Sequence, residues 1–441
     1  RGPPLLVRHG SLLLSGSRFG RGPRVEHPLL LTEAGGQVKP VEPGMGSEKK
    51  VAREAKRGHN LPMLLRDTAF VLITTVAVYA SIYAPQPILP LLAGEFGLTT
   101  SGGALLMTAV LLPLSFAPLF YGLLLESQPA KRMLLVTIGI LALLQAAFGA
   151  AESYGLLLAA RLFQGACVPA ILAAITSYLA YTVDREHIQR AMTYFVAANI
   201  FGGFVGRVLS GWVATNAGWR YTFFLIALAL GGCFVAVTRM KADSRLSMSS
   251  VRLSAVMPIL RNGDISRLYA VAFTIFFAFM ALLTFLPFRL KEIDPSYTTF
   301  VISMMYSGFL MGIAVSASAT TIIRLAGGEK RAMTIGLTLF GISMLLINVP
   351  SGAGIFAIMF VMCGGMFFVH AVALGTMNKL ATENRAVANG LYISIYYTGA
   401  ALGSYLPGLI YQGAGWAAFT LTLTAAIAGA VAITRGLKIS G

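Results

Sequence analysis

From Thr68 to its end, the chain alternates long apolar runs with short polar breaks. A helix needs about 20 apolar residues to cross the hydrocarbon layer of a membrane. The runs that approach or exceed this length lie at residues 68–94, 100–125, 132–151, 154–182, 188–214, 219–238, 268–290, 297–323, 332–349, 352–378, 386–411 and 415–435. The pattern therefore predicts an all-α membrane protein with twelve transmembrane helices.

The composition excludes an ordinary soluble fold for a chain of 441 residues. Hydrophobic residues make up 56% of the sequence and charged residues only 12%, whereas soluble domains carry about 25% charged residues. A single soluble core stops growing at about 250–300 residues. Because one core cannot bury this much apolar surface, the lipid bilayer must act as the solvent, and we expect a multi-pass membrane protein.

The formal net charge is +17, and the placement of the basic residues decides what this charge means. One set of loops holds Lys131, Arg132, Arg185, Arg190, Arg239, Lys241, Arg245, Arg252, Arg261, Arg267, Arg324, Lys330, Arg331, Lys379 and Arg385. The opposite set holds only Arg220, Arg289 and Lys291. Cytoplasmic loops carry such an excess of basic residues, so we expect both termini in the cytoplasm, a bacterial inner-membrane location and no nucleic-acid partner.

The same reading divides the chain into four parts. Residues 1–66 are rich in Gly, Pro, Lys and Arg. We interpret them as a disordered basic cytoplasmic tail, or as an over-extended gene start whose true first residue is Met45 or Met63. Residues 67–238 form a predicted N-terminal six-helix bundle, residues 239–267 a basic cytoplasmic linker loop, and residues 268–441 a C-terminal six-helix bundle.

An internal repeat supports this division into halves. Five residues of the first half recur 197 residues later in the second half. They are Gly202, Gly206, Gly211, Gly218 and Trp219, which recur as Gly399, Gly403, Gly408, Gly415 and Trp416. Two parallel copies of one unit, related by a pseudo-two-fold axis along the membrane normal, are typical of one class of secondary transporter.

Three motifs resemble those of the major facilitator superfamily, and the resemblance covers the chain from about Leu61 onward. The loop after the second span resembles G-x-L-x-D-R-x-G-R-R through Gly122, Glu126, Lys131 and Arg132, and departs from it at Ser127, Pro129 and Ala130. Arg161, Gln164 and Gly165 match R-x-x-Q-G. The run 202–211 is similar to the antiporter motif G-x-x-x-G-P-x-x-G-G, with Arg207 in place of proline.

Together with the first-span sequence 81–93, the run 202–211 resembles a bacterial subgroup of arabinose-efflux-type and multidrug facilitators. The resemblance implies transport by rocker-switch alternating access between two bundles. It also implies proton-coupled efflux of a small organic solute, with no cofactor besides the proton gradient, and a monomer in the bilayer. An importer or facilitator of a small metabolite with the same fold is the alternative.

Glycines spaced by four residues let helices approach closely in lipid. We therefore expect the helices that carry Gly202, Gly206, Gly211, Gly399, Gly403 and Gly408 to pack tightly, either as the moving seam of a gate or as packing alone. If these glycines form the gate, we expect Gly206→Leu to stop transport while the protein still inserts into the membrane.

Arg161 and Arg207 are the candidate solute-binding cations, because an arginine inside a membrane span is costly unless it is paired or hydrated. The alternatives are a structural or proton-coupling role for Arg161, and for Arg207 a side chain that reaches the membrane surface. No Asp or Glu lies in the middle of a span. Two cations without a buried acid favour an anionic or neutral polar solute over cationic drugs. Such a solute can be a drug-like compound.

The remaining candidate residues are polar side chains within apolar runs. His370 titrates near neutral pH and could carry the coupling proton, or it could be a packing residue. Tyr79, Tyr83 and Gln86 share one face of the first span by their spacing, as Tyr392 and Tyr396 do in the eleventh. We expect these residues to line the solute path together with Gln164.

The sequence offers no support for an enzyme, because it contains neither HExxH nor GxSxG and no cluster of acids. It contains no Walker motif, so ATP is not the predicted energy source. Cys167, Cys233 and Cys363 all lie in apolar runs without CxxC spacing, which predicts neither disulfides nor a metal site. A sensor or scaffold would need an added signalling domain, which the tail does not provide.

Overall fold

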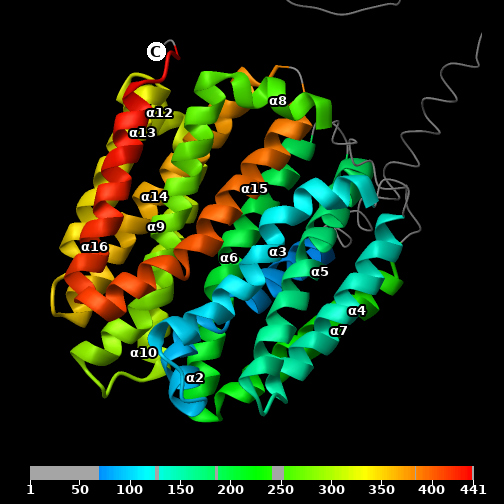
Figure 1. Cartoon of the computed structure of the whole chain (residues 1–441). Helices are drawn as coiled ribbons and strands as arrows, with labels where there is room; N and C mark the ends of the chain where they lie inside the picture. Colours follow the sequence, from blue (N-terminus) through cyan, green and yellow to red (C-terminus); the bar gives the residue numbers. More distant parts are fainter. Residues whose placement is uncertain (1–68, 125–128, 184–186, 241–252, 383, 440–441) are drawn as a thin grey trace, which may run out of the picture. The chain divides into compact units, whose positions relative to one another are not determined.

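The computed structural model of the chain describes residues 69–124, 129–183, 187–240, 253–382 and 384–439. Within these ranges every regular element is a helix (Figure 1). The described residues all belong to one compact unit, which covers residues 59–441. The prediction of an all-α membrane fold is therefore confirmed. The predicted tail 1–66 and Glu126 lie outside the described residues.

The helices of the first half follow the predicted spans to within a few residues. The first span, Ala69–Glu95, is interrupted after residue 83 and continues as η1 (Gln86–Ile88) and α2 (Leu89–Glu95). The interruption follows from Pro85 and Pro87, because proline lacks the N–H that continues the hydrogen-bond ladder of a helix. The other helices of this half are α3 (Thr100–Leu124), α4 (Ala130–Gly149), α5 (Tyr154–Thr182), α6 (Ile188–Asn216) and α7 (Trp219–Thr238).

The second half contains more and shorter helices than predicted. Its elements are α8 (Leu253–Arg261), α9 (Gly263–Ile293), α10 (Thr299–Met304), η2 (Met305–Ser307), α11 (Gly308–Ala317), α12 (Ala319–Ala326), α13 (Glu329–Leu346), α14 (Gly352–Leu380), α15 (Arg385–Gly403) and α16 (Leu406–Arg435). The predicted span 297–323 is thus divided among four elements. Helix α8 and the first turn of α9 occupy the second part of the predicted linker 239–267.

The predicted boundary between the spans 386–411 and 415–435 agrees with the backbone, because the φ of 80° at Gly415 interrupts the helical backbone of α16. A further break divides the predicted span 386–411. Helix α15 ends at Gly403, and Pro407 stands in the first turn of the next helix, where its missing N–H costs nothing. Hydropathy alone could not show this break, because the residues on both sides of it are apolar.

The helices fit a membrane by length and by surface. Nine helical stretches in the described ranges are long and apolar enough to cross a bilayer, and α3 adds a shorter apolar stretch over Thr100–Phe116. The exact count of twelve spans stays a prediction. The outer faces expose large apolar side chains, such as Leu143 in α4 at 72% and Leu228 in α7 at 73%. Contiguous exposed apolar surface marks contact with lipid rather than water.

The internal repeat of the sequence reappears as a repeat of contacts. A methyl group built on four of the repeated glycines would collide with the backbone of the helix that opens the same half. The contacts are Gly202 with Val76, Gly206 with Ala80, Gly399 with Phe273, and Gly403 with Phe277. Each contact of the second half lies 197 residues after its counterpart in the first. The glycines are therefore needed for close approach in both halves.

Hydrogen bonds repeat in the same way. Lys131 donates to the carbonyl of Thr238, with an Nζ–O distance of 2.9 Å, and Lys330 donates to that of Leu437 at 3.0 Å. Donor and acceptor have both moved by 199 residues. The two halves therefore share the same helix contacts and hydrogen bonds at these positions.

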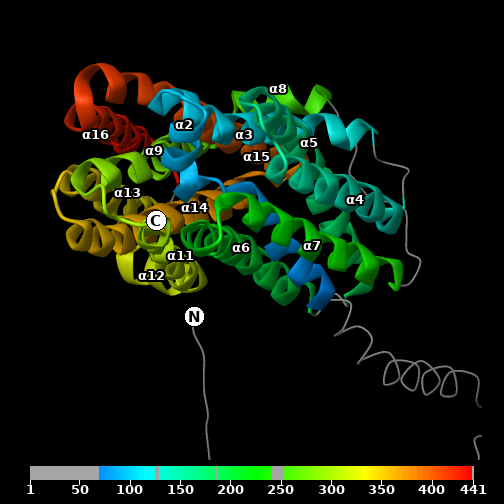
Figure 2. The same ribbon diagram turned by 90° about the horizontal axis from the view of Figure 1, so that it is seen from below.

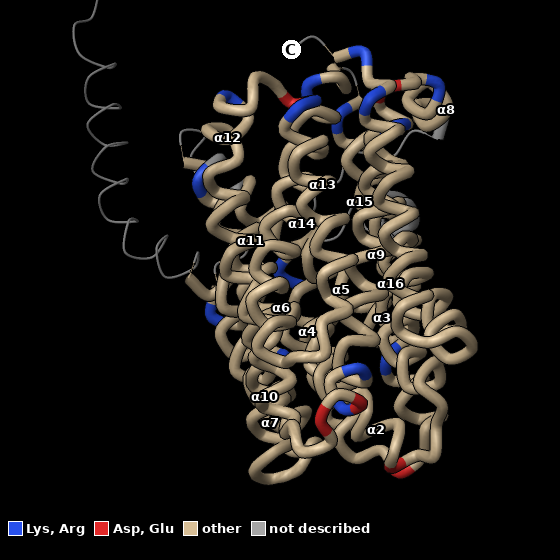
Figure 3. The backbone as a smooth tube through the Cα atoms, turned by 90° about the vertical axis from the view of Figure 1, so that its left-hand side faces the viewer, with Lys and Arg blue, Asp and Glu red and all other residues tan. Residues whose placement is uncertain are grey.

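The two halves meet along α3 with α15 and along α6 with α10 and α11. Figure 2 shows α4 and α7 on one side of the molecule and α13 and α16 on the other. Thr108 of α3 shares a hydrogen bond of 2.8 Å with Ser404, and Thr215 of α6 shares one of 2.8 Å with Thr299 of α10. The bond between Thr215 and Thr299 lies where α6 ends and α10 begins. Lys and Arg gather at the opposite end of the bundle, which carries α8 and the C-terminus (Figure 3).

Candidate functional site

Two arginines lie deep within the helices, on neighbouring elements. Arg161 of α5 and Arg207 of α6 are both 0% exposed and are the largest fully buried side chains described. Burying a cation costs several kcal/mol unless its donors find partners. Their partners therefore decide what each arginine can do.

All three nitrogens of the Arg161 guanidinium donate to protein acceptors. Its Nε donates to the carbonyl of Leu106 at 3.1 Å, and its Nη1 donates to the carbonyl of Ser81 at 3.0 Å and to Oε1 of Gln164 at 2.9 Å. Its Nη2 donates to the carbonyl of Ile82. Every nitrogen of this side chain is therefore engaged, and Arg161 joins α5 to α3 and to the first span.

The acceptors of Arg161 are explained by the prolines of the first span. The carbonyl of Ser81 lies four residues before Pro85, so no helical N–H reaches it. An unpaired carbonyl is costly in a membrane, where no water replaces the lost donor. Arg161 supplies that donor, and Gln145 of α4 adds a second one at 3.4 Å. The contacts thus give Arg161 the role of holding the break in the first span.

Arg207 reaches the same break from the other side but is not saturated. Its Nε donates to Oε1 of Gln86 at 2.7 Å, and its Nη1 donates to the carbonyl of Gly203 at 2.8 Å. Its Nη2 is buried and has no hydrogen-bond partner among the described residues. Gln86 in turn donates through Nε2 to Thr284 of α9 at 3.2 Å. The guanidinium is therefore tied to both halves while one of its nitrogens stays open.

Aromatic rings from both halves surround Arg207. The guanidinium carbon lies 4.3 Å from the ring centre of Tyr83, 4.8 Å from that of Tyr306 and 4.5 Å from that of Phe309. Tyr83 belongs to the first span, whereas Tyr306 and Phe309 belong to η2 and α11. Cation–π contacts stabilise a cation by about 0.5–2 kcal/mol each, and they leave its N–H groups available. The rings thus stabilise the charge without neutralising it.

A second cluster surrounds His370 of α14. Its Nδ1 lies 3.1 Å from the hydroxyl of Tyr392, and its ring packs against Phe276 and Tyr396, with ring centres 5.0 and 5.6 Å away. Phe276 and Tyr396 stack on each other at 4.4 Å. Tyr79 and Tyr83 of the first span are also near each other, at 6.4 Å between ring centres. The residues predicted for the eleventh span, Tyr392 and Tyr396, therefore gather around His370.

The described carboxylates all lie at helix ends, away from the two arginines. Glu95 accepts the indole N–H of Trp219 at 2.7 Å and pairs with Arg220 at 2.8 Å. At the opposite end, a hydrogen bond from Lys379 holds the pKa of the Glu329 carboxyl below its ordinary value. Among the described residues no group of three or more His, Cys, Asp or Glu could hold a metal ion.

The motif residues occupy packing positions. A methyl group on Gly165 would collide with the backbone of Val110, and one on Gly211 with Ser303 of α10. One on Gly408 would collide with the ring of Phe285. Lys131 also donates to the carbonyl of Met240. Gly122 lies in the last turn of α3, and Arg132 is exposed in the first turn of α4.

Several residues at the arginine site were not predicted from the sequence. Tyr306, Phe309 and Thr284 contact Arg207 or Gln86, and the buried Ser210 and the half-buried Asn199 leave side-chain oxygens without partners on α6. The signal for the α6 residues was available: positions 199, 203, 207 and 210 follow the spacing of one helix face. For the residues of the second half no local signal exists, because their partner lies some hundred positions away.

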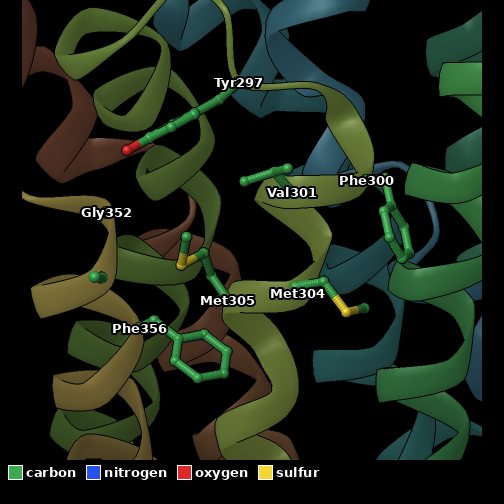
Figure 4. A pocket seen from close by; sticks show the side chains of 8 residues that line it. Tyr297, Phe300, Val301, Met304, Met305, Gly352 and Phe356 are labelled. Atoms are coloured by element: carbon green, nitrogen blue, oxygen red, sulfur yellow. The ribbon is translucent and has the colours of Figure 1, made fainter.

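An apolar cavity of about 330 Å³ lies between α10 and the start of α14 (Figure 4). It is lined by Tyr297, Phe300, Val301, Met304, Met305, Gly352, Ala353 and Phe356. Val301 and Phe356 are 38% and 37% exposed, so the cavity opens to the outer surface of the bundle. It contains none of the predicted site residues, and its apolar lining suits lipid better than a polar solute.

Comparison with known proteins identifies the family of this architecture. Residues 71–327 match the model of the Major Facilitator Superfamily. The chain is similar to the inner membrane transport protein YnfM of Escherichia coli, with 26% identity over 82% of this chain and 87% of that protein. It is similar to the uncharacterized MFS-type transporter YybF of Bacillus subtilis, with 23% identity over 77% of this chain and 85% of that protein.

A shorter stretch, 38% of this chain, is 26% identical to 29% of the efflux pump FUB11 of Gibberella moniliformis. The family consists of membrane transporters rather than enzymes, which agrees with the buried arginines and the absence of a catalytic motif in the sequence. The repeated helix contacts, the apolar outer surface and the family match lead to one conclusion: the chain belongs to the Major Facilitator Superfamily and is a multi-pass membrane transport protein.

Proposed function

We propose that the protein is a secondary active transporter of the bacterial inner membrane that exports a small organic anion, or a neutral polar solute, in exchange for protons. The observation that carries this proposal is the pair of fully buried arginines, with no carboxylate among the described residues between the helix ends. A fixed positive charge in a medium of low dielectric attracts anions and repels cations. Both termini lie in the cytoplasm in this proposal, as the basic residues at that end favour.

Alternating access is supported by where the halves touch. The hydrogen bond between Thr215 and Thr299 joins the halves at the last turn of α6 and the first turn of α10. The bond between Thr108 and Ser404 joins them deeper in the bundle. In the proposed orientation the junction of α6 and α10 lies at the periplasmic end, so the structure corresponds to a state closed to the outside. The solute would then enter from the cytoplasm, between the first span, α9, α14 and α15. These helices carry Tyr83, Phe276, His370 and Tyr396, respectively.

The test is transport by the purified full-length protein in proteoliposomes with an imposed pH gradient. We expect an organic anion to move against its gradient when protons move the other way, and a cationic dye such as ethidium not to be transported. Reversal of the coupled fluxes under the same gradient would instead indicate an importer. Export of ethidium that is abolished by Arg161→Ala would contradict the proposal.

His370 is the proposed proton carrier, because it is the described titratable side chain nearest the aromatic residues of the solute path. Tyr392 and Tyr396 of α15 and Phe276 of α9 face its ring, and no described acid does. We expect His370→Gln to flatten the dependence of transport rate on pH, because a glutamine side chain cannot take up and release a proton as histidine can. The measurement is initial transport rate against pH in proteoliposomes.

The matched control for this prediction is Tyr392→Phe, which removes the hydrogen-bond partner of His370 but keeps both the ring and the histidine. It should shift the pH profile without flattening it. A profile for His370→Gln that superimposes on that of the wild type would rule out His370 as the coupling residue.

A further inference from the structure

The two buried arginines differ in what they can still bind. All nitrogens of Arg161 donate to protein acceptors, whereas Nη2 of Arg207 has no partner among the described residues. A buried donor without a partner costs about 1–3 kcal/mol, so it marks a place where a ligand atom is stabilising. The guanidinium nitrogen that is still available to bind an anion therefore belongs to Arg207 and not to Arg161.

A second unpartnered polar atom lies one helical turn from Arg207. The hydroxyl of Ser210 is fully buried and has no hydrogen-bond partner among the described residues. Residues three apart on a helix are neighbours on one face, with Cβ atoms about 5–6 Å apart. Arg207 and Ser210 therefore present two open hydrogen-bond groups on the same face of α6. A carboxylate has two oxygens, and this pair of groups can serve both.

The surroundings of this pair specify the rest of the ligand. Tyr83 of the first span packs on Arg207. Tyr396 stacks on Phe276, and all three rings are only half-buried. The first span, α9 and α15 thus each contribute a partly accessible aromatic ring. Flat apolar groups pack favourably against such rings, with ring centres about 4.5–7 Å apart.

We propose that the solute is a monocarboxylate with a flat apolar body, bound through its carboxylate by Nη2 of Arg207 and the hydroxyl of Ser210. This assignment rests on the proposed transport function and narrows its substrate class. A dicarboxylate fits poorly, because its second charge would be buried without a free cation. A cation fits worse still, because Arg207 repels it.

The internal repeat indicates one such site in each chain. The position 197 residues after Arg207 holds Ser404. Helices α5 and α14 begin 198 residues apart, and the position 198 residues after Arg161 holds Met359. Ser404 already shares a hydrogen bond with Thr108. The second half contributes aromatic rings to the site, through Tyr306, Phe309, Phe276 and Tyr396, but no second arginine. We therefore expect one carboxylate to bind each protein molecule.

The experiment measures binding of benzoate and of benzamide, its neutral analogue of the same shape, to the purified full-length protein by isothermal titration calorimetry. We expect benzoate to bind with a stoichiometry of one and benzamide to bind about tenfold more weakly or worse. Arg207→Gln should abolish this preference, and Arg207→Lys should retain part of it, because the charge remains while the planar fork is lost.

Ser210→Ala is the second variant, chosen because losing a buried hydroxyl without a partner should not impair folding. We expect it to weaken benzoate binding several-fold and to leave benzamide binding unchanged. The matched control is Thr222→Val, which removes another buried hydroxyl without a partner, on α7, and should change neither affinity. Arg220→Gln, an arginine at the end of the bundle, controls for the loss of one positive charge.

Equal affinity for benzoate and benzamide would overturn the carboxylate assignment, as would unchanged benzoate binding by both Arg207→Gln and Ser210→Ala. Either result leaves the proposed transport function standing if the same protein moves another anion or a neutral solute in proteoliposomes. The loss of all gradient-driven transport for every solute tested would instead count against the transport function itself.

Discussion

Replacing Arg161 by leucine should destabilise the protein more than any other single substitution in the described helices. The change removes one donor from each of the carbonyls of Ser81, Ile82 and Leu106, and it leaves Oε1 of Gln164 unpaired. Each buried acceptor without a donor costs about 1–3 kcal/mol, and the loss of the buried cation offsets only part of the sum. We expect a loss of about 3 kcal/mol or more, measured as thermal unfolding in detergent.

The comparison with other arginines makes this prediction specific. Arg161→Lys keeps the charge and part of the hydrogen bonding, so it should lose less stability than Arg161→Leu. Arg220→Leu removes a half-exposed ion pair with Glu95, which is worth about 1 kcal/mol at most. An Arg161→Leu protein that unfolds at the same temperature as the wild type would show that the break in the first span needs no such support.

The second large effect is expected at Gly403. A methyl group there would collide with the backbone of Phe277, and one on the repeat-related Gly206 would collide with that of Ala80. Because a helix backbone cannot move aside as a side chain can, Gly403→Ala and Gly206→Ala must separate two packed helices. Overpacking of this kind costs about 1–3 kcal/mol. We expect both variants to lose stability in thermal unfolding and to transport slowly, and Gly206→Leu to insert without transporting.

The chain offers a matched control on the same helix. Gly390 of α15 has open space where a methyl group would stand. Gly390→Ala should therefore be neutral or raise the stability of α15 by up to about 1 kcal/mol, because alanine is the better helix former. Similar behaviour of Gly390→Ala and Gly403→Ala would mean that close approach of α15 to α9 is not what the glycine at 403 provides.

The sequence predicted those parts of the structure that depend on local pattern or on the repeat. Apolar length predicted the helices, and the matched glycines predicted that their helices pack tightly, because small residues let helices approach closely in lipid. The contact of Gly206 with the backbone of Ala80 is an example. The R-x-x-Q-G motif pointed to Arg161 and Gln164, which the structure places in contact.

What the sequence could not predict depends on distant partners. The hydrogen bond between Gln86 and Thr284 and the rings of Tyr306 and Phe309 around Arg207 join segments that only the packed fold brings together. The same holds for the distinction between the arginines, because it rests on which donors are already used. The break between α15 and α16, which lies inside the predicted span 386–411, was missed for a different reason: hydropathy does not change there, and only Gly403 and Pro407 mark it.

Under the proposed alternating access, the uneven placement of the buried charges would make the resting voltage of the cell part of the transport cycle. Arg161 and Arg207 both belong to the first half, so rocking of the halves would carry positive charge through the electric field on one side of the molecule only. A potential of 100 mV acts on each elementary charge with about 2.3 kcal/mol over the full field. An inside-negative voltage would therefore draw the empty carrier toward its inward-facing form. A bound carboxylate would cancel one of the two charges and weaken that bias by half.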